Sequence, residues 1–161
     1  MATAAGLPGT TPVARRAGKY LTFVLAEETY GLEILTVREI IGLMAITSVP
    51  QTPAFVKGVI NLRGKVIPVV DLRLKFGIAA AESTRETCII VVNVGQIETG
   101  IVVDRVSEVL DIEEEEISDT PSFGTSVDSS FILGIGKAGN KVSMLLDIGK
   151  VLGGDALASL A

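Results

Sequence analysis

The chain has 161 residues but no histidine, no tryptophan and only one cysteine. Without an imidazole it lacks the usual general base, the base of a serine-type triad and a phospho-accepting histidine. Zinc sites built from histidine or from several cysteines are excluded as well. One cysteine cannot form an internal disulfide, and Cys88 lies in an apolar run, so it is interpreted as a small buried hydrophobe.

Long apolar runs are also missing from the sequence. None reaches the about 18 residues that a membrane-spanning helix requires. Residues 1–18 contain no continuous apolar segment of the kind found in signal peptides, and we expect them to form a flexible N-terminal tail. The net charge of −5 argues against nucleic acid as a general partner.

Branched aliphatic residues and glycine are what the chain has in abundance. Hydrophobic residues make up 48% of the sequence, of which aromatic residues are a small part, and there are 17 glycines. Valine and isoleucine favour strands, and glycines favour the tight turns between them. The composition therefore predicts a mainly β domain that is large enough to bury its own core.

The strongest internal feature is a duplication. Residues 20–41 align with residues 89–110, and residues 55–77 align with residues 131–153. Each copy predicts a hairpin, a short turn or helix, a further strand, a second hairpin and a helical turn. Because a module of this size is near the lower limit for an independent core, we expect the two modules to share a buried seam. Their expected bounds are about 19–78 and about 86–153.

Both copies carry the same short sequence signals for helix ends. Asp71 precedes a short amphipathic stretch that Gly77 follows, which predicts an N-cap, a short helix and a C-terminal glycine. Asp147 and Gly153 stand at the equivalent positions of the second copy. Gly64 predicts a tight turn between two apolar strands.

Little in the sequence points to catalysis. The acidic run at residues 113–116 has no alternation of oxygen ligands, so a solvated helix start or loop explains it better than a calcium site. The glycines at residues 134–139 do not end in the Gly-Lys-Ser/Thr of a phosphate loop. Glu39 and Glu108 recur at equivalent positions, which indicates a structural role such as bonding an arginine or a backbone amide. We therefore expect no metal, no cofactor and no enzymatic activity.

Arg63 is the exception among the charged residues, because its counterpart in the second copy is Gly139 and the scaffold therefore does not require it. It stands at the tip of the predicted turn, where functional residues are often found. A solvated basic face is the alternative interpretation.

Four stretches closely resemble the CheW family: residues 20–23, 30–40, 53–73 and 100–110. The most specific is the block at residues 58–73, which reads GVINLRGKVIPVVDLR. The resemblance runs from about Lys19 to Leu152 and identifies residues 19–154 as a CheW-like domain. It implies a mainly β fold of two intertwined SH3-like five-stranded β-barrel subdomains with a few short helices.

The resemblance also implies a function. It is that of a non-enzymatic adaptor between the regulatory domain of the CheA histidine kinase and the cytoplasmic tip of methyl-accepting chemotaxis receptors. Such a protein is cytoplasmic and is recruited to membrane-associated chemoreceptor arrays. The receptor tip is expected to lie in a groove between the barrels, with Glu39 and Arg63 forming a charge-assisted pair at its edge. The residues expected to form the groove are Ile34, Val37, Glu39, Gly58, Arg63, Val106 and Val109.

Two alternatives stay open at the level of sequence. The chain fits equally well a coupling protein of a chemosensory pathway that controls something other than flagellar swimming, since the contact surfaces would look alike. A small-ligand-binding barrel is the alternative from a different class, although no unexplained pair of an acid and a base supports it.

The glycine at position 58 yields a prediction, because a glycine within a strand often marks a close approach of another backbone. We expect Gly58→Asp to impair folding or partner docking, as measured by thermal unfolding and by capture of a receptor-tip fragment. Wild-type behaviour in both measurements would contradict the assignment.

Overall fold

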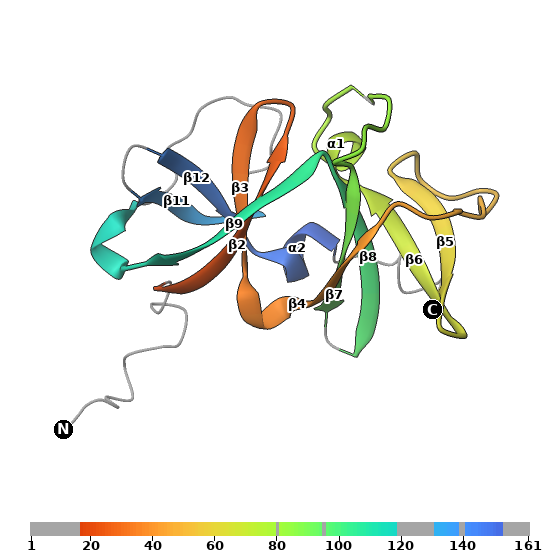
Figure 1. Cartoon of the computed structure of the whole chain (residues 1–161), viewed down its shortest axis with the longest axis horizontal. Coiled ribbons are helices and arrows are strands. Elements are labelled where there is room, and N and C mark those ends of the chain that lie inside the picture. The colour runs from red at the N-terminus through yellow and green to blue at the C-terminus, as the bar shows by residue number, and fades with distance from the viewer. Residues whose placement is uncertain (1–16, 80, 95, 119–130, 139–140, 153–161) are drawn as a thin grey trace.

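The computed structural model describes residues 17–79, 81–94, 96–118, 131–138 and 141–152 (Figure 1). The tail predicted for residues 1–18 lies outside this set except for its last two residues. Gly139 and Gly153 also lie outside it.

The two repeats have nearly the same order of elements. The first contains β2 (Gly18–Leu25), β3 (Glu28–Glu33), the 3-10 helix η2 (Ile34–Thr36), β4 (Val37–Gly42), β5 (Val56–Leu62), β6 (Lys65–Asp71) and α1 (Leu72–Lys75). The second contains β7 (Cys88–Val94), β8 (Ile97–Val103), β9 (Arg105–Ile112), η3 (Glu114–Glu116), β10 (Ile117–Ser118), β11 (Ile132–Ala138), β12 (Lys141–Leu146) and α2 (Ile148–Leu152). An isolated bridge between Thr47 and Val59 takes the place in the first repeat that the β10–β11 pairing takes in the second.

The repeats exchange their first hairpins. The β2–β3 hairpin of the first repeat lies in a six-stranded sheet with the order β10-β11-β12-β3-β2-β9. The β7–β8 hairpin of the second repeat lies in a five-stranded sheet with the order β4-β7-β8-β6-β5. Parallel pairs, β12 with β3 and β6 with β8, join the repeats within each sheet. The mainly β, intertwined fold is thus confirmed, and Figure 1 shows the two sheets side by side.

One large cluster of buried side chains lies between the sheets, and we call it the shared core. Two smaller clusters belong to one sheet each, around Ile67 in the five-stranded sheet and around Tyr20 in the six-stranded sheet. Strand residues alternate between the two kinds of cluster because successive side chains point to opposite faces. The shared core consists of Leu21, Phe23, Leu25, Tyr30, Leu32, Val56, Val70, Leu72, Phe76, Ile90, Val92, Ile101, Val103, Leu146, Ile148, Val151 and Leu152.

Gly58 lies in β5 directly beneath another stretch of backbone. Its φ is +143°, and a Cβ atom placed there would lie 2.0 Å from the carbonyl oxygen of Thr47. The close approach is fixed by the bridge, in which the Thr47 N–H donates to Val59 O at 2.9 Å and the Val59 N–H donates to Thr47 O at 2.8 Å. Any side chain at position 58 therefore displaces backbone, so a substitution there acts on folding before it acts on a partner.

The predicted helix cap on Asp71 is confirmed. Its Oδ1 accepts from the backbone N–H groups of Arg73 at 2.9 Å and Leu74 at 3.4 Å. Gly77 follows the helix with a φ of +77°, the left-handed conformation that favours glycine. In the second repeat Asp147 accepts from the Lys150 N–H at 3.2 Å. The capping signal therefore holds in both copies, with the shorter bond in the first.

Because the two caps differ, we expect their removal to lower the free energy of unfolding by unequal amounts. Asp71 is buried, and its carboxylate satisfies two N–H groups of α1, so we expect Asp71→Ala to lower the free energy of unfolding by about 1–2 kcal/mol. Asp147→Ala is the matched control and should cost less, because that residue is more exposed. Urea unfolding of the two variants tests this, and equal losses would contradict it.

Candidate functional site

Strands β4 and β9 are equivalent in the two repeats, and each carries two aliphatic residues at the margin of the shared core. Val37 and Ile40 pair across β4 and β7 with Val92 and Ile90. Both of these partners belong to the shared core. Since residues directly opposite each other in a sheet share a face, Val37 and Ile40 point to the same side as the shared core.

The same relation holds on β9. Val106 pairs with Phe23 and Val109 pairs with Leu21, and both partners belong to the shared core. Ile34, in the short helix before β4, also packs against this core. We call Ile34, Val37, Ile40, Val106 and Val109 the seam surface.

The seam surface is aliphatic and open at both ends. Ile40 is 46% exposed and Val109 is 50% exposed, whereas Val37 and Val106 are partly buried. Figure 1 shows β4 and β9 leaving the middle of the molecule toward opposite sides. Because Val37 and Val106 stand at the beginning of these strands, the buried part of the surface is central and the exposed residues lie farther out.

A β-bulge interrupts each of the two strands at the equivalent place. The register of β4 against β7 shifts between Val37 and Glu39, and that of β2 against β9 shifts between Leu21 and Phe23. In the second bulge the Thr22 hydroxyl donates to Glu108 O at 2.7 Å and accepts from the Glu108 N–H at 3.1 Å. Bulges of this kind re-aim the side chains that follow them.

The glutamate beside each bulge forms an ion pair with the tip of a hairpin. Glu39 pairs with Arg63, whose φ of +53° beside Gly64 at +87° makes a two-residue turn closed by the bond from the Gly64 N–H to Asn61 Oδ1 at 2.8 Å. The charge-assisted pair predicted for these two residues is therefore present.

The second ion pair joins Glu108 to Lys141 at 3.1 Å, at the hairpin between β11 and β12. The structural role predicted for Glu39 and Glu108 thus takes the same form in both repeats.

The seven residues predicted for the groove fall into two groups. Ile34, Val37, Val106 and Val109 come together on the seam surface. Glu39 and Arg63 form the ion pair at the tip of the β5–β6 hairpin, and Gly58 lies beneath the Thr47 backbone. That they bind a receptor stays a prediction. The sequence reasoning missed Ile40, although it is the repeat counterpart of Val109 at the same alignment offset.

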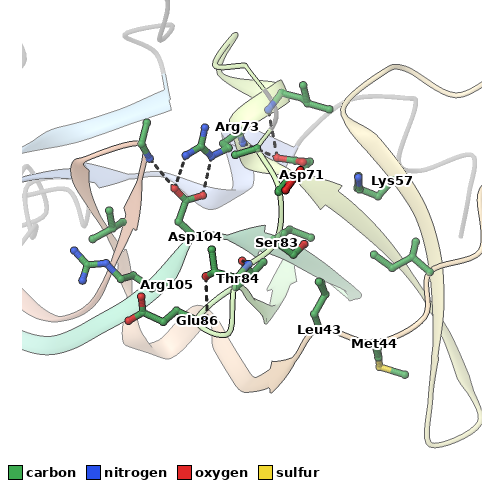
Figure 2. A pocket seen from close by; sticks show the side chains of 18 of the residues that line it. Leu43, Met44, Lys57, Asp71, Arg73, Ser83, Thr84, Glu86, Asp104 and Arg105 are labelled. Carbon is green, nitrogen blue, oxygen red and sulfur yellow. Dashed lines mark hydrogen bonds and ion pairs between the residues drawn. The ribbon is translucent and has the colours of Figure 1, made fainter.

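An open cavity of about 960 Å³ lies elsewhere, and none of the seven predicted residues lines it. Its walls come from the β2–β3 turn, the β4–β5 loop, α1, the segment around Ser83 and the bend between β8 and β9 (Figure 2). Its lining mixes cations such as Lys57 and Arg105 with carboxylates such as Glu82 and Glu86. Such a mixture selects for no particular charge on a ligand.

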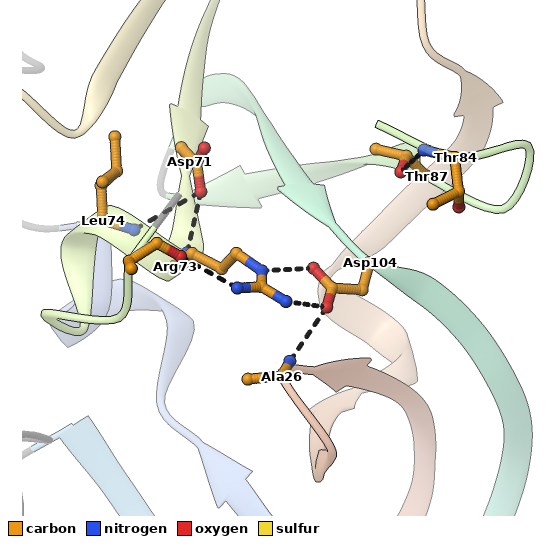
Figure 3. A network of polar contacts seen from close by, with 8 residues as sticks. Ala26, Asp71, Arg73, Leu74, Thr84, Thr87 and Asp104 are labelled. Atoms are coloured by element: carbon orange, nitrogen blue, oxygen red, sulfur yellow. Dashed lines mark hydrogen bonds and ion pairs between the residues drawn. The ribbon is translucent and has the colours of Figure 1, made fainter. Parts of the chain in front are cut away.

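The wall of this cavity contains a network that joins both sheets (Figure 3). Asp104 accepts from Arg73 Nε at 2.8 Å and Nη2 at 2.6 Å, and also from the Ala26 N–H at 2.9 Å. Arg73 Nη1 donates to Ala79 O at 2.9 Å. The bonds from the Arg73 guanidinium hold the pKa of the Asp104 carboxyl below its ordinary value.

Features of other protein classes are missing from the described part of the chain. No helix there has the length and apolar character needed to span a membrane. Among the same residues, no three or more histidine, cysteine, aspartate or glutamate side chains are grouped so as to hold a metal ion.

Comparisons with known proteins agree with one another. A family model described as the CheW-like domain matches residues 19–155. The chain is 39% identical to the chemotaxis protein CheW of Klebsiella aerogenes, over 94% of this chain and 95% of that protein. It is 35% identical to the chemotaxis protein CheW of Thermotoga maritima, over 82% of this chain and 85% of that protein. The crystal structure of the scaffolding protein TtCheW from Thermoanaerobacter tengcongensis superposes with a TM-score of 0.79 at 38% identity, covering 87% and 90% of the two chains.

The Asp104 network predicts a dependence of stability on pH. Near neutral pH we expect Asp104→Asn to lower the free energy of unfolding by about 2 kcal/mol, because two hydrogen bonds to a charged group lose their strength. Below the ordinary aspartate pKa of about 4, the unfolded chain takes up a proton before the folded chain does. The wild type therefore loses this contribution as the pH falls through the lowered pKa.

The stability difference between the wild type and Asp104→Asn should accordingly stay constant from about pH 7 to about pH 5 and shrink as the pH falls from about 5 to about 3. Urea unfolding at a series of pH values measures it. A difference that stays constant over this range would show that the charge of Asp104 does not stabilise the fold.

Proposed function

The chain belongs to the family of CheW-like domains, and from this we propose that it is a non-enzymatic adaptor that couples chemoreceptor tips to the CheA histidine kinase. As a member of a scaffold family it is a chemotaxis scaffold protein. Its two proposed partners are the cytoplasmic tip of methyl-accepting receptors and the regulatory domain of the kinase. Its proposed location is the cytoplasm, from which it is recruited to membrane-associated arrays.

The observation that supports receptor binding most directly is the seam surface. Exposed aliphatic side chains on two different strands suit the apolar stripe of an amphipathic helix. Burial of Ile40 and Val109 supplies the favourable contact area, since apolar surface removed from water stabilises a complex in proportion to its area. Arg63 supplies direction, because its guanidinium has five donors, few of which the single carboxylate of Glu39 can satisfy.

An adaptor without catalysis also fits the inventory of side chains. The sequence has no histidine, and the carboxylates that recur in both repeats serve as helix caps or ion-pair partners. Binding two partners at once requires separate rigid surfaces and no reaction. A molecule of two sheets around one core provides such surfaces.

The experiment is capture of a receptor-tip fragment and of a kinase regulatory-domain fragment, each alone and then together. We expect the wild-type chain to retain both. Arg63→Ala should weaken capture of the receptor tip about fivefold, the upper size expected of an exposed charged contact at the edge of a binding surface, without lowering the melting temperature. The ion pair is exposed and so contributes little to folding.

Arg85→Ala is the matched control, because it removes the same side chain from the exposed segment between the repeats. It should bind like the wild type. Melting of Arg63→Ala well below the wild type would make Arg63 a structural residue. Failure of the wild-type chain to retain either fragment would refute the adaptor function.

A further inference from the structure

The chain passes between the two sheets twice, and each passage leads directly into the seam surface. The first passage contains Leu35, and Val37 follows it by two residues. The second contains Asp104, and Val106 follows it by two residues. Both valines are partly buried and stand at the beginning of β4 and β9. The way each passage is held therefore fixes the position of one half of the seam surface.

Asp104 holds the second passage to both sheets at once (Figure 3). Its carboxylate accepts two bonds from Arg73, which belongs to α1 at the end of β6 in the five-stranded sheet. The same carboxylate accepts from the Ala26 N–H, and the Asp104 N–H donates to Val24 O at 3.1 Å. These last two residues belong to the β2–β3 hairpin of the six-stranded sheet. The beginning of β9 is thus bonded to elements of both sheets.

The turn between β2 and β3 has a backbone that needs such a bond. Ala26 and Glu27 have φ angles of +57° and +118°, although neither residue is glycine. A backbone in this region is strained, and it persists only where the surrounding structure holds it in place. The bond from the Ala26 N–H to Asp104 contributes to this hold. The turn and the second passage therefore keep their shapes together.

Val106 also has a contact of its own with the five-stranded sheet. Burial raises the pKa of the thiol of Cys88, the first residue of β7, and a hydrogen bond from the Val106 backbone lowers it in part. The β9 half of the seam surface is thus attached to the five-stranded sheet at Asp104 and again at Val106.

The bonds of the first passage are local by comparison. This passage runs through η2, where the Thr36 hydroxyl donates to Glu33 O at 2.7 Å. Leu35, the counterpart of Asp104, has an aliphatic side chain that can form no hydrogen bond, and it is 94% exposed. The two halves of the seam surface therefore differ in how they are held, although β4 and β9 are equivalent strands.

We infer that Arg73 is a positioning residue for partner binding, because through Asp104 it keeps the β9 half of the seam surface in the position that the receptor tip recognises. This inference rests on the proposed function. The counterparts of the pair are Gly149 and Leu35, so the repeated scaffold does not require it. A surface that already has its bound shape loses less conformational entropy on binding, and this is the advantage that the pair supplies.

The test measures the affinity of the full chain for a receptor-tip fragment by titration calorimetry, at a temperature at which every variant is folded. Arg73→Lys keeps the charge but loses the two parallel bonds to Asp104, because an ammonium group cannot replace a planar guanidinium. We expect it to raise the dissociation constant about fivefold, a size typical of residues that modulate binding without touching the ligand. Hydrogen exchange at the Val106 N–H should also be faster in this variant.

Ile67→Val is the matched control for stability. Ile67 is buried in the small cluster of the five-stranded sheet, so the change lowers the melting temperature without altering the second passage. Its dissociation constant should equal that of the wild type. Arg73→Lys combined with Asp104→Asn should bind no more weakly than the weaker single variant, because both changes remove the same ion pair.

The outcomes distinguish this inference from the proposed function. Wild-type affinity of Arg73→Lys, or unchanged exchange at Val106, would overturn the inference and leave the adaptor in place. An equal loss of affinity in Ile67→Val would overturn it as well, since affinity would then follow stability alone. Effects that multiply in the double variant would show that Arg73 and Asp104 act separately, against the inference. Failure of the wild-type chain to bind would remove the proposed function and this inference with it.

Discussion

The exchange of the β2–β3 and β7–β8 hairpins is the constraint on which the rest of the molecule depends. Each sheet is completed by strands from the other repeat, through the parallel pairs β12–β3 and β6–β8. Neither repeat can therefore complete its sheet alone, and the largest cluster of buried side chains belongs to both. The seam surface follows from this arrangement, because the shared core ends in partly exposed aliphatic residues at β4 and β9.

The two repeats share one scaffold. They differ where a residue of one repeat has a chemically different counterpart in the other. The chain passes between the sheets twice, from β3 to β4 and from β8 to β9. At the second passage Asp104 binds Arg73 and the Ala26 N–H, which ties three segments together. At the first passage the equivalent residue is Leu35, which is 94% exposed. The β8–β9 passage is thus fixed by the ion pair of Asp104 with Arg73, whereas the β3–β4 passage exposes an aliphatic side chain to solvent.

Residues whose role depends on near neighbours in the chain were predicted well. The cap on Asp71, the left-handed Gly77 and the turn at Gly64 each follow from the conformational preferences of a few consecutive residues. The pairing of Glu39 with Arg63 is nonlocal and was expected from the family resemblance. Ile40 and the partner of Glu108 were missed, because a strand residue shows its exposure only when its cross-strand neighbours are known. Gly58 was recognised as a close-approach position, but only the structure identifies the Thr47 carbonyl above it.

The sequence by itself determined the duplication, the succession of strands and short helices in each repeat, the turns and the helix caps. It also excluded imidazole chemistry, because no histidine is present. The tertiary structure decided which hairpin joins which sheet, and therefore which side chains meet at the seam. The physical reason is that alternation along a strand marks two faces but names no partner strand. Pairing between distant segments is chosen by how all of them pack around one core.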